Sequence, residues 1–151
     1  MSSREIAGAA LGNRNHPERA ATSRNILLVS EDPRELELWL TAFGRAELSD
    51  YLAVASGGDE AARAILANPP DVAVLDHQVI EHRGPGLLTL IRTSFPIVPI
   101  LVFTDTESAR DIGRLYELGV VSVYSKPRKR DDYLNLIASL AQLAYLRIPP
   151  P

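Results

Sequence analysis

The chain has 151 residues, of which 46% are hydrophobic, so it can bury one good core but is short for two ordinary domains. Its formal net charge of -3 provides no broad positive field for a phosphate backbone, and we expect no direct nucleic-acid partner. The absence of cysteine excludes disulfides, thiolate metal sites and a catalytic thiol, and it fits a cytoplasmic location.

The first 24 residues show neither an apolar period nor a strand pattern. They are rich in Ala, Ser, Asn and Arg and offer little apolar surface to bury. We expect residues 1–24 to form a disordered arm, residues 25–147 to form one folded domain, and residues 148–151 to be a short tail. No apolar run approaches the ~20 residues of a membrane-spanning helix, and we expect no membrane partner.

Five short aliphatic or β-branched segments are predicted strands. They alternate with amphipathic segments and cover residues 26–29, 52–55, 72–75, 98–103 and 121–124. The segments ILLV, VAVL and PILVF are apolar almost throughout, which is typical of strands that are covered on both faces of a sheet.

The segments between the strands are predicted helices. Leu36, Trp39, Leu40 and Phe43 follow the spacing of one helix face, and Gly44 is placed to end that helix. The other four helices cover residues 59–67, 87–92, 107–118 and 131–146. A strand followed by a helix five times over requires parallel strands with helical crossovers. The predicted fold is a doubly wound, flavodoxin-like α/β domain, (βα)5, with the common strand order 2-1-3-4-5.

Polar residues gather at the carboxyl ends of the predicted strands, where ligands bind in sheets of this kind. The residues that follow strands one, three, four and five are Ser30-Glu31-Asp32, Asp76, Thr104-Asp105 and Ser125-Lys126-Pro127. In the order 2-1-3-4-5, strands one and three are neighbours, which brings Glu31 or Asp32 near Asp76. Clustered carboxylates repel one another unless a cation joins them, and an all-oxygen set is what Mg²⁺ prefers.

Three of these residues fit the chemistry of an acyl phosphate. A carboxylate beside a metal can attack a phosphoryl group and hold it, while an ammonium and a hydroxyl contact its oxygens. Asp76, Lys126 and Thr104 fit these roles in that order. A lone lysine after a strand is more often a surface cation, but its order in the sequence with Asp76 and Thr104 favours a functional role.

The ordered motifs resemble those of the bacterial response-regulator receiver domain, of the chemotaxis-regulator type. NILLVSEDP is similar to the first strand and acidic turn of that family, PPDVAVLD to its phosphorylation strand, PILVFTD to its fourth strand and VYSKP to its fifth. The similarity covers roughly residues 24–147. Each motif alone is weak, and the ordered set is specific.

The resemblance implies a signalling protein of a two-component phosphorelay and not an enzyme. Asp76 would accept a phosphoryl group from a histidine kinase or a phosphotransfer protein, with Thr104 and Lys126 sensing it. Mg²⁺ would be the cofactor, held by Glu31, Asp76 and the main-chain carbonyl of Gln78. Because no output domain follows in the sequence, we expect a stand-alone receiver domain.

The first acidic turn departs from the family pattern. Ser30 stands where the first of two acids is common, and Glu31 is longer than the usual aspartate, so the metal site is weakened or reshaped. Asp32 offers another charge, but Asp32, Pro33 and Glu35 also form the pattern of a helix N-cap, a proline at N1 and an acid at N3. We favour capping for Asp32.

Two further departures concern access and switching. Asp105 follows Thr104 at a position that is usually small, because bulk there controls access to the phosphoryl site. The same aspartate also fits the start of a helix, and both interpretations stay open. Val123 occupies the place of the family's aromatic switch residue, with Tyr124 one position later. Alternation along a strand predicts that these two side chains point to opposite faces.

The loop after Asp76 and the Lys126-Pro127 pair carry two more expectations. Ile80 and Arg83 replace the proline and the acid that are usual after the acceptor, so the segment HQVIEHRGPG is expected to take its own conformation and to be a partner-specific surface. The resemblance also implies a cis peptide bond between Lys126 and Pro127.

The last predicted helix is apolar over most of its circumference. Its apolar residues include Leu134, Leu136, Ile137, Leu140, Leu143, Tyr145 and Leu146. Since one sheet face cannot cover all of them, we predict a homodimer or partner interface through the fourth helix, fifth strand and fifth helix. The alternative function is a pseudo-receiver, a protein-interaction module that works without phosphorylation.

Overall fold

The computed structural model describes residues 25–83 and 86–147, so the predicted arm and tail lie outside the described residues. In this part of the chain, five parallel strands form one sheet in the order β2-β1-β3-β4-β5. The strands are β1 (Ile26–Val29), β2 (Leu52–Ala55), β3 (Val72–Asp76), β4 (Ile100–Thr104) and β5 (Ser122–Ser125). The predicted flavodoxin-like fold is confirmed.

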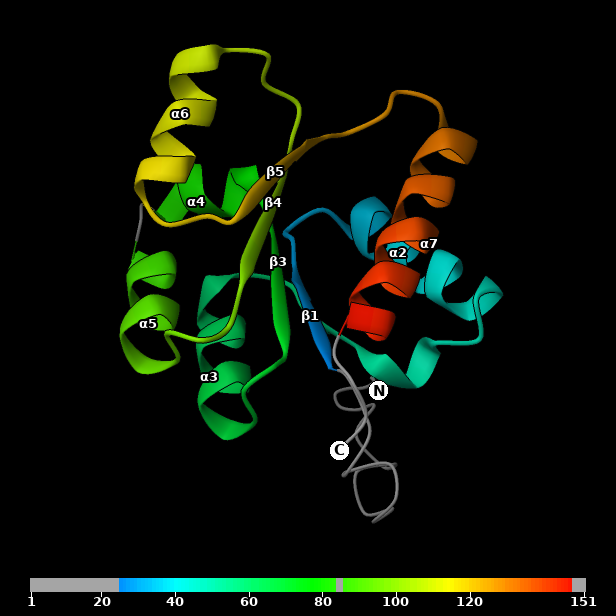
Figure 1. Ribbon diagram of the computed structural model, residues 1–151, viewed down its shortest axis with the longest axis horizontal. Coiled ribbons are helices and arrows are strands. Elements are labelled where there is room, and N and C mark those ends of the chain that lie inside the picture. The colour runs from blue at the N-terminus through cyan, green and yellow to red at the C-terminus, as the bar shows by residue number, and fades with distance from the viewer. Residues whose placement is uncertain (1–24, 84–85, 148–151) are drawn as a thin grey trace.

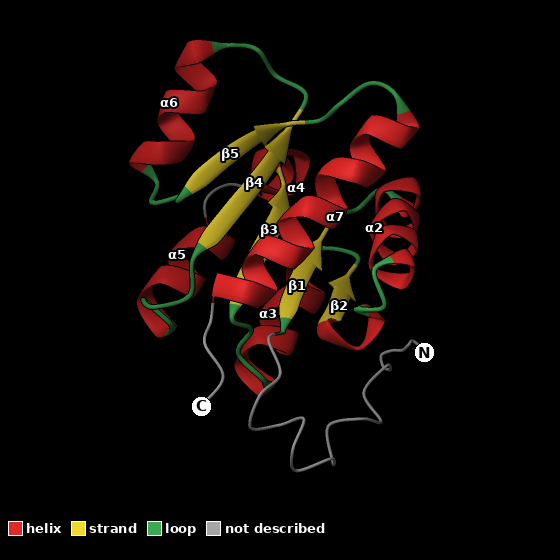
Figure 2. Ribbon diagram, turned by 45° about the vertical axis from the view of Figure 1, so that its right-hand side comes forward, coloured by secondary structure: helices red, strands yellow, loops and turns green. Residues whose placement is uncertain are grey.

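Helices cover both faces of the sheet, as Figures 1 and 2 show. The helices of the described residues are α2 (Pro33–Arg45), α3 (Gly58–Ala67), α4 (His77–Arg83), α5 (Gly86–Ser94), α6 (Ala109–Glu117), α7 (Arg130–Arg147) and the short 3-10 helix η2 (Ser49–Tyr51). Helices α2 and α7 lie together on one face, and their buried side chains share a cluster with β1 and β3. Helices α3 to α6 contribute to a second cluster on the opposite face.

Helix α2 begins at the predicted residue. The Asp32 side chain accepts a hydrogen bond from the Arg34 N–H at 2.9 Å, and Pro33 follows at the first helical position. This hydrogen bond from the backbone lowers the pKa of Asp32. The predicted capping role of Asp32 is therefore confirmed.

Helix α4 follows Asp76 directly, although the sequence analysis assigned no helix or strand to this segment. Val79 and Ile80 are both buried in the cluster formed by α3, α5 and the sheet. Because tertiary burial stabilises a short helix that would not form alone, these two side chains account for α4. Residues 77–83 of the segment HQVIEHRGPG form this helix, and residues 84–85 lie outside the described part of the chain.

The side chains of Val123 and Tyr124 point to opposite faces of β5, as alternation predicted. Val123 packs against the cluster of α3 to α6, whereas Tyr124 packs against the cluster of α2 and α7. Tyr124 stacks on Phe103, with ring centroids 5.4 Å apart. Val123, where the resemblance implies an aromatic residue, thus carries a small aliphatic side chain on the face opposite to Tyr124.

In the part of α7 whose side chains the structure describes, the apolar residues pack against the sheet and α2. Leu134 and Ile137 are buried, and Leu136 and Leu140 pack against the same cluster. Helix α2 covers apolar side chains of α7 that the sheet alone would leave exposed, and the interface predicted on this helix stays a prediction. Leu143, Tyr145 and Leu146 have side chains outside the described residues. Among the described residues, no helix has the length and apolar character needed to cross a membrane.

Gly119 ends α6 in a backbone conformation that disfavours other residues, with a φ of 100°. A Cβ at this position would lie 2.3 Å from Nε of Arg92, whose Nη1 donates to the Leu118 carbonyl at 3.1 Å. We expect Gly119→Ala to lower the free energy of unfolding by about 1–3 kcal/mol, because it combines strain with displacement of Arg92. Urea denaturation measures this change.

Gly113→Ala is the matched control, since Gly113 lies within α6 and a Cβ there meets no atom within 4 Å. This substitution is expected to stabilise the protein by up to about 1 kcal/mol, the usual gain of alanine over glycine inside a helix. Equal effects of the two substitutions would contradict the strain assigned to Gly119.

Candidate functional site

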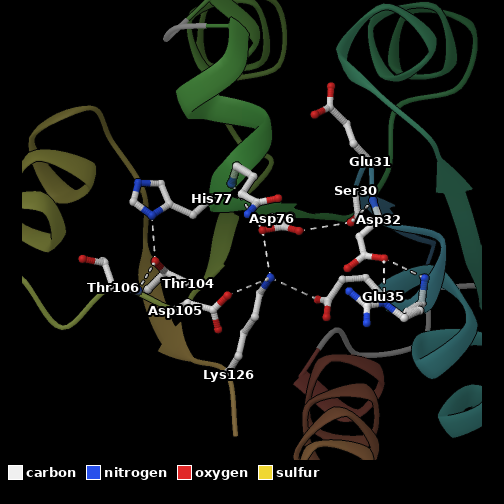
Figure 3. A network of polar contacts seen from close by, with 12 residues as sticks. Ser30, Glu31, Asp32, Glu35, Asp76, His77, Thr104, Asp105, Thr106 and Lys126 are labelled. Atoms are coloured by element: carbon white, nitrogen blue, oxygen red, sulfur yellow. Dashed lines mark hydrogen bonds and ion pairs between the residues drawn. The ribbon is translucent and has the colours of Figure 1, made fainter. Parts of the chain in front are cut away.

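The carboxyl ends of β1, β3, β4 and β5 bring a set of polar side chains together (Figure 3). Asp76, the last residue of β3, is buried and accepts three hydrogen bonds. They come from Ser30 Oγ at 3.1 Å, Lys126 Nζ at 3.0 Å and the Gln78 N–H at 3.3 Å. The structure therefore places the predicted acceptor next to the predicted lysine, at the point where the strand order reverses.

Ser30 fills the position of the first acid with a neutral hydroxyl. It is fully buried at the end of β1, donates to Asp76 and accepts from the Asp32 N–H at 3.1 Å. In a capping box, the acid at N3 would satisfy that N–H. Since Ser30 satisfies it here, the side chain of Glu35 is free for another partner.

The Lys126 ammonium lies among three carboxylates. Its Nζ lies 3.0 Å from Asp76, 3.6 Å from Glu35 and 4.0 Å from Asp105. Burial alone would lower the pKa of Lys126, but the charges of Glu35 and Asp76 outweigh burial, and the pKa is raised. The ammonium stays charged and partly neutralises the site.

The Lys126–Pro127 peptide bond is trans, as are the other peptide bonds of the described residues. The cis bond implied by the resemblance is therefore wrong for this chain. The trans form of an X-Pro bond is intrinsically favoured by about 0.5–1 kcal/mol, and Lys126 reaches Asp76 without isomerisation.

Glu35 is a site residue that the sequence analysis missed. It is 7% exposed, accepts a hydrogen bond from the Tyr133 hydroxyl at 2.5 Å and lies beside Lys126. Burial raises its pKa and exceeds the opposing effects of Tyr133 and Lys126. The spacing held a signal, because Glu35 precedes the buried Trp39 and Phe43 by four and eight residues and so lies on the inner face of α2.

Thr104 is held by groups other than Asp76. Its Oγ1 lies 2.7 Å from Nδ1 of His77 and accepts from the Thr106 N–H at 3.0 Å. His77 and Thr104 are both buried. Among the hydrogen bonds of the described residues, none joins Thr104 to Asp76, so the predicted phosphoryl-sensing hydroxyl is engaged by a neighbouring histidine.

Asp105 does not start a helix. The N-cap of α6 is Ser108, whose side chain accepts from the Asp111 N–H at 3.2 Å. Asp105 is exposed, and its carboxylate faces Lys126 at 4.0 Å. Of its two interpretations, helix capping is wrong, and the control of access to the phosphoryl site stays a prediction.

The predicted metal ligands do not converge in this conformation. The Glu31 side chain points away from Asp76 (Figure 3). Its Oε1 lies at hydrogen-bonding distance, 2.6 Å, from Nδ1 of His82. Gln78 lies in the first turn of α4, where a main-chain carbonyl points toward the C-terminal end of the helix. The described residues contain no cluster of three His, Cys, Asp or Glu side chains that could hold a metal ion. The oxygen chemistry fits Mg²⁺, but Glu31 must turn to take part.

The fold and site define a flavodoxin-like α/β domain with a buried aspartate and a partly buried lysine at the switch point of its sheet. The family model of the response regulator receiver domain matches residues 26–138, and the chain belongs to this family. Receiver domains are signalling modules and not classical enzymes.

Solved structures agree with this assignment. The phosphorylated cyanobacterial phytochrome response regulator RcpA is 20% identical with a TM-score of 0.72, and the match covers 85% of this chain and 99% of that chain. A response regulator in red light signaling of R. palustris is 26% identical with a TM-score of 0.68, covering 84% and 98%. The Mn²⁺-bound form of response regulator Rcp1 is 21% identical with a TM-score of 0.70, covering 85% and 99%. No curated protein matches the chain.

Proposed function

We propose that Asp76 accepts a phosphoryl group from a histidine kinase or a phosphotransfer protein, and that the chain acts as a switch in a two-component phosphorelay. The observation that carries this proposal is the buried Asp76 carboxylate with Lys126 Nζ at 3.0 Å. In the transfer, the P–N bond of a phosphohistidine breaks while an O–P bond forms at Asp76, and the imidazole keeps the electron pair. Lys126 then faces the phosphoryl oxygens.

Phosphorylation increases a negative charge that is already in excess. Three carboxylates lie within 4.0 Å of the Lys126 ammonium, and an acyl phosphate carries one more negative charge than the carboxylate it replaces. A divalent cation offsets this excess. We propose Mg²⁺, with Asp76 and a reoriented Glu31 as ligands and with Gln78 joining if the first turn of α4 opens.

The test is incubation of the protein with acetyl phosphate and Mg²⁺, followed by intact mass spectrometry. We expect the mass of one phosphoryl group to be added, and its absence at saturating acetyl phosphate would contradict phosphorylation of this chain. We propose that the same carboxylate accepts the phosphoryl group from acetyl phosphate and from the phosphohistidine of a partner protein.

The need for Mg²⁺ and the role of Glu31 in binding it can be tested separately. Chelation of Mg²⁺ with EDTA is expected to stop the reaction with acetyl phosphate. His82→Ala frees the Glu31 carboxylate, and we expect it to tighten Mg²⁺ binding by up to about fivefold, since an exposed pair contributes ~0.2–1 kcal/mol. We expect Glu31→Gln to weaken Mg²⁺ binding. Isothermal titration calorimetry measures the Mg²⁺ affinity of both variants and of the wild type. Unchanged affinity in Glu31→Gln would exclude Glu31 as a ligand.

A second candidate function is the pseudo-receiver, and the orientation of Glu31 favours it. Ser30 replaces an acidic side chain with a hydroxyl that donates to Asp76, and the Glu31 carboxylate already has a partner in His82, so this site offers fewer free carboxylates to a metal. If the chain is a pseudo-receiver, the wild type and the Asp76→Asn variant should bind the partner with equal affinity. The acetyl phosphate experiment separates the two functions.

The face formed by α6, β5 and α7 is the surface that we propose to respond to phosphorylation. Tyr116 and Val121 are its exposed large apolar side chains among the described residues. The predicted homodimer would use this face. Sedimentation of the wild type and of Val121→Asp tests it, and a monomer at high micromolar concentration would exclude the homodimer.

A further inference from the structure

Glu35 and Tyr133 form a buried polar pair beside Asp76 that phosphoryl transfer itself does not use. Glu35 is on α2 and Tyr133 is in the first turns of α7, and they are 7% and 4% exposed. Oε1 of Glu35 accepts the Tyr133 hydroxyl at 2.5 Å and lies 3.6 Å from Lys126 Nζ. One carboxylate oxygen therefore joins the lysine of the site to α7.

The Lys126 ammonium is shared between two acids. Its side chain is 11% exposed, so water supplies little of its hydration, and the carboxylates of Asp76 and Glu35 take its place. Only one of them, Asp76, is at hydrogen-bonding distance. The two acids compete for a single cation, so a change in the charge of one carboxylate changes the strength of the ion pair between Lys126 and the other.

We propose that Glu35 competes with the phosphoryl group on Asp76 for Lys126, and that the Glu35–Tyr133 hydrogen bond transmits the outcome to α7. The inference rests on the proposed function, since it concerns the phosphorylated state of Asp76. The additional charge at Asp76 draws the ammonium away from Glu35. A buried carboxylate that loses its cation is destabilised, and its remaining partner is the Tyr133 hydroxyl.

Tyr133 is well placed to detect this change. Its phenol has a raised pKa because it is buried and bonded to Glu35, so the hydroxyl remains the donor. Its ring stacks on Phe103 at 5.7 Å, and Phe103 stacks on Tyr124 of β5. Since Val123 stands in the usual aromatic position, this network offers β5 and α7 another connection to Asp76.

Beryllofluoride with Mg²⁺ serves as the probe for the phosphorylated state. Glu35→Gln removes the competing charge and keeps an oxygen that can accept the Tyr133 hydroxyl. We expect it to bind beryllofluoride roughly three- to tenfold more tightly than wild type. The control is Glu37→Gln, which removes an exposed charge from the same helix and should leave the affinity unchanged. Equal affinity of Glu35→Gln and wild type would overturn the competition.

Transmission to α7 has its own readout. In protein with labelled tyrosine, the NMR signals of the Tyr133 ring are expected to shift on addition of beryllofluoride in wild type and to stay fixed in Glu35→Gln. Tyr133→Phe keeps the ring and removes the donor, and it should bind beryllofluoride while the amide signals of α7 no longer respond. An unchanged α7 response in Tyr133→Phe would overturn the proposed route.

The resting protein separates this inference from the phosphorylation proposal. Even if wild type binds no beryllofluoride, so that the proposed function fails, the shared lysine can be tested by ¹⁵N NMR of the Lys126 ammonium. We expect Glu35→Gln to move this signal and to lower the pKa of Lys126, whereas Glu37→Gln does neither. A Lys126 signal that ignores Glu35→Gln would refute the sharing of the ammonium.

Discussion

Asp76→Asn is expected to gain no phosphoryl group from acetyl phosphate and Mg²⁺ under conditions in which the wild type gains one. The substitution replaces the nucleophilic carboxylate with an amide of the same shape. Its remaining oxygen can still accept from Ser30 or Lys126, so the fold of the site is kept while its reactivity is lost. The expected effect is complete loss, measured by intact mass and by the mass of the peptide that contains residue 76.

Asp105→Asn is the control for this experiment. Asp105 is exposed and faces the same lysine at 4.0 Å, so its removal keeps Asp76 intact and reduces repulsion toward a phosphoanion. We expect modification at least as fast as in wild type. Continued addition of one phosphoryl group to Asp76→Asn would show that another side chain is the acceptor, and the proposal for Asp76 would be wrong.

Lys126→Met is expected to lower the free energy of unfolding by about 3 kcal/mol at neutral pH. The methionine fills much of the same volume, but it leaves the carboxylates of Asp76 and Glu35 buried without a cation. Breaking a buried ion pair by removing one partner typically costs about 3–5 kcal/mol. Urea denaturation measures the change. Lys129→Met, which removes an exposed charge three residues later, should have little effect.

This loss should depend on pH in a definite direction. Burial raises the pKa of Glu35 above its ordinary value of 4.5, so the folded protein binds more protons than the unfolded chain between 4.5 and the raised value. Stability therefore falls as the pH rises through that raised pKa. Without Lys126 the pKa of Glu35 rises further, and the difference between the variant and wild type should narrow as the pH is lowered toward 4.5. A difference independent of pH would contradict the role assigned to Glu35.

The fold could be predicted because the sequence repeats one local pattern. The apolar segments at β1, β3 and β4 are uninterrupted, and the helix that contains Trp39 and Phe43 shows a clear inner face. These patterns report local geometry and burial, and alternation of strand and helix then fixes a parallel sheet. The first and last residues of the strands were predicted less accurately. The strand predicted at residues 98–103 begins at Ile100, because Pro99 cannot donate to the ladder.

The convergence of Asp76 and Lys126 could also be predicted, because strand ends meet at one edge of the sheet. The orientation of individual side chains could not. Glu31 turns to His82, which is 51 residues away in sequence, and Glu35 finds Tyr133 at a separation of 98 residues. Such pairs depend on how α4 and α7 dock, and local spacing does not contain that information.

Ser30 affects how strongly the stability of the resting domain depends on divalent ions. An aspartate there would place a second buried carboxylate against Asp76, and the stability of the folded state would then rise with the logarithm of the concentration of a divalent ion that binds the pair. The hydroxyl instead donates to Asp76, and Lys126 supplies the positive charge from within the chain. We therefore expect the thermal stability of the resting domain to depend less on Mg²⁺ than it would with an aspartate at position 30.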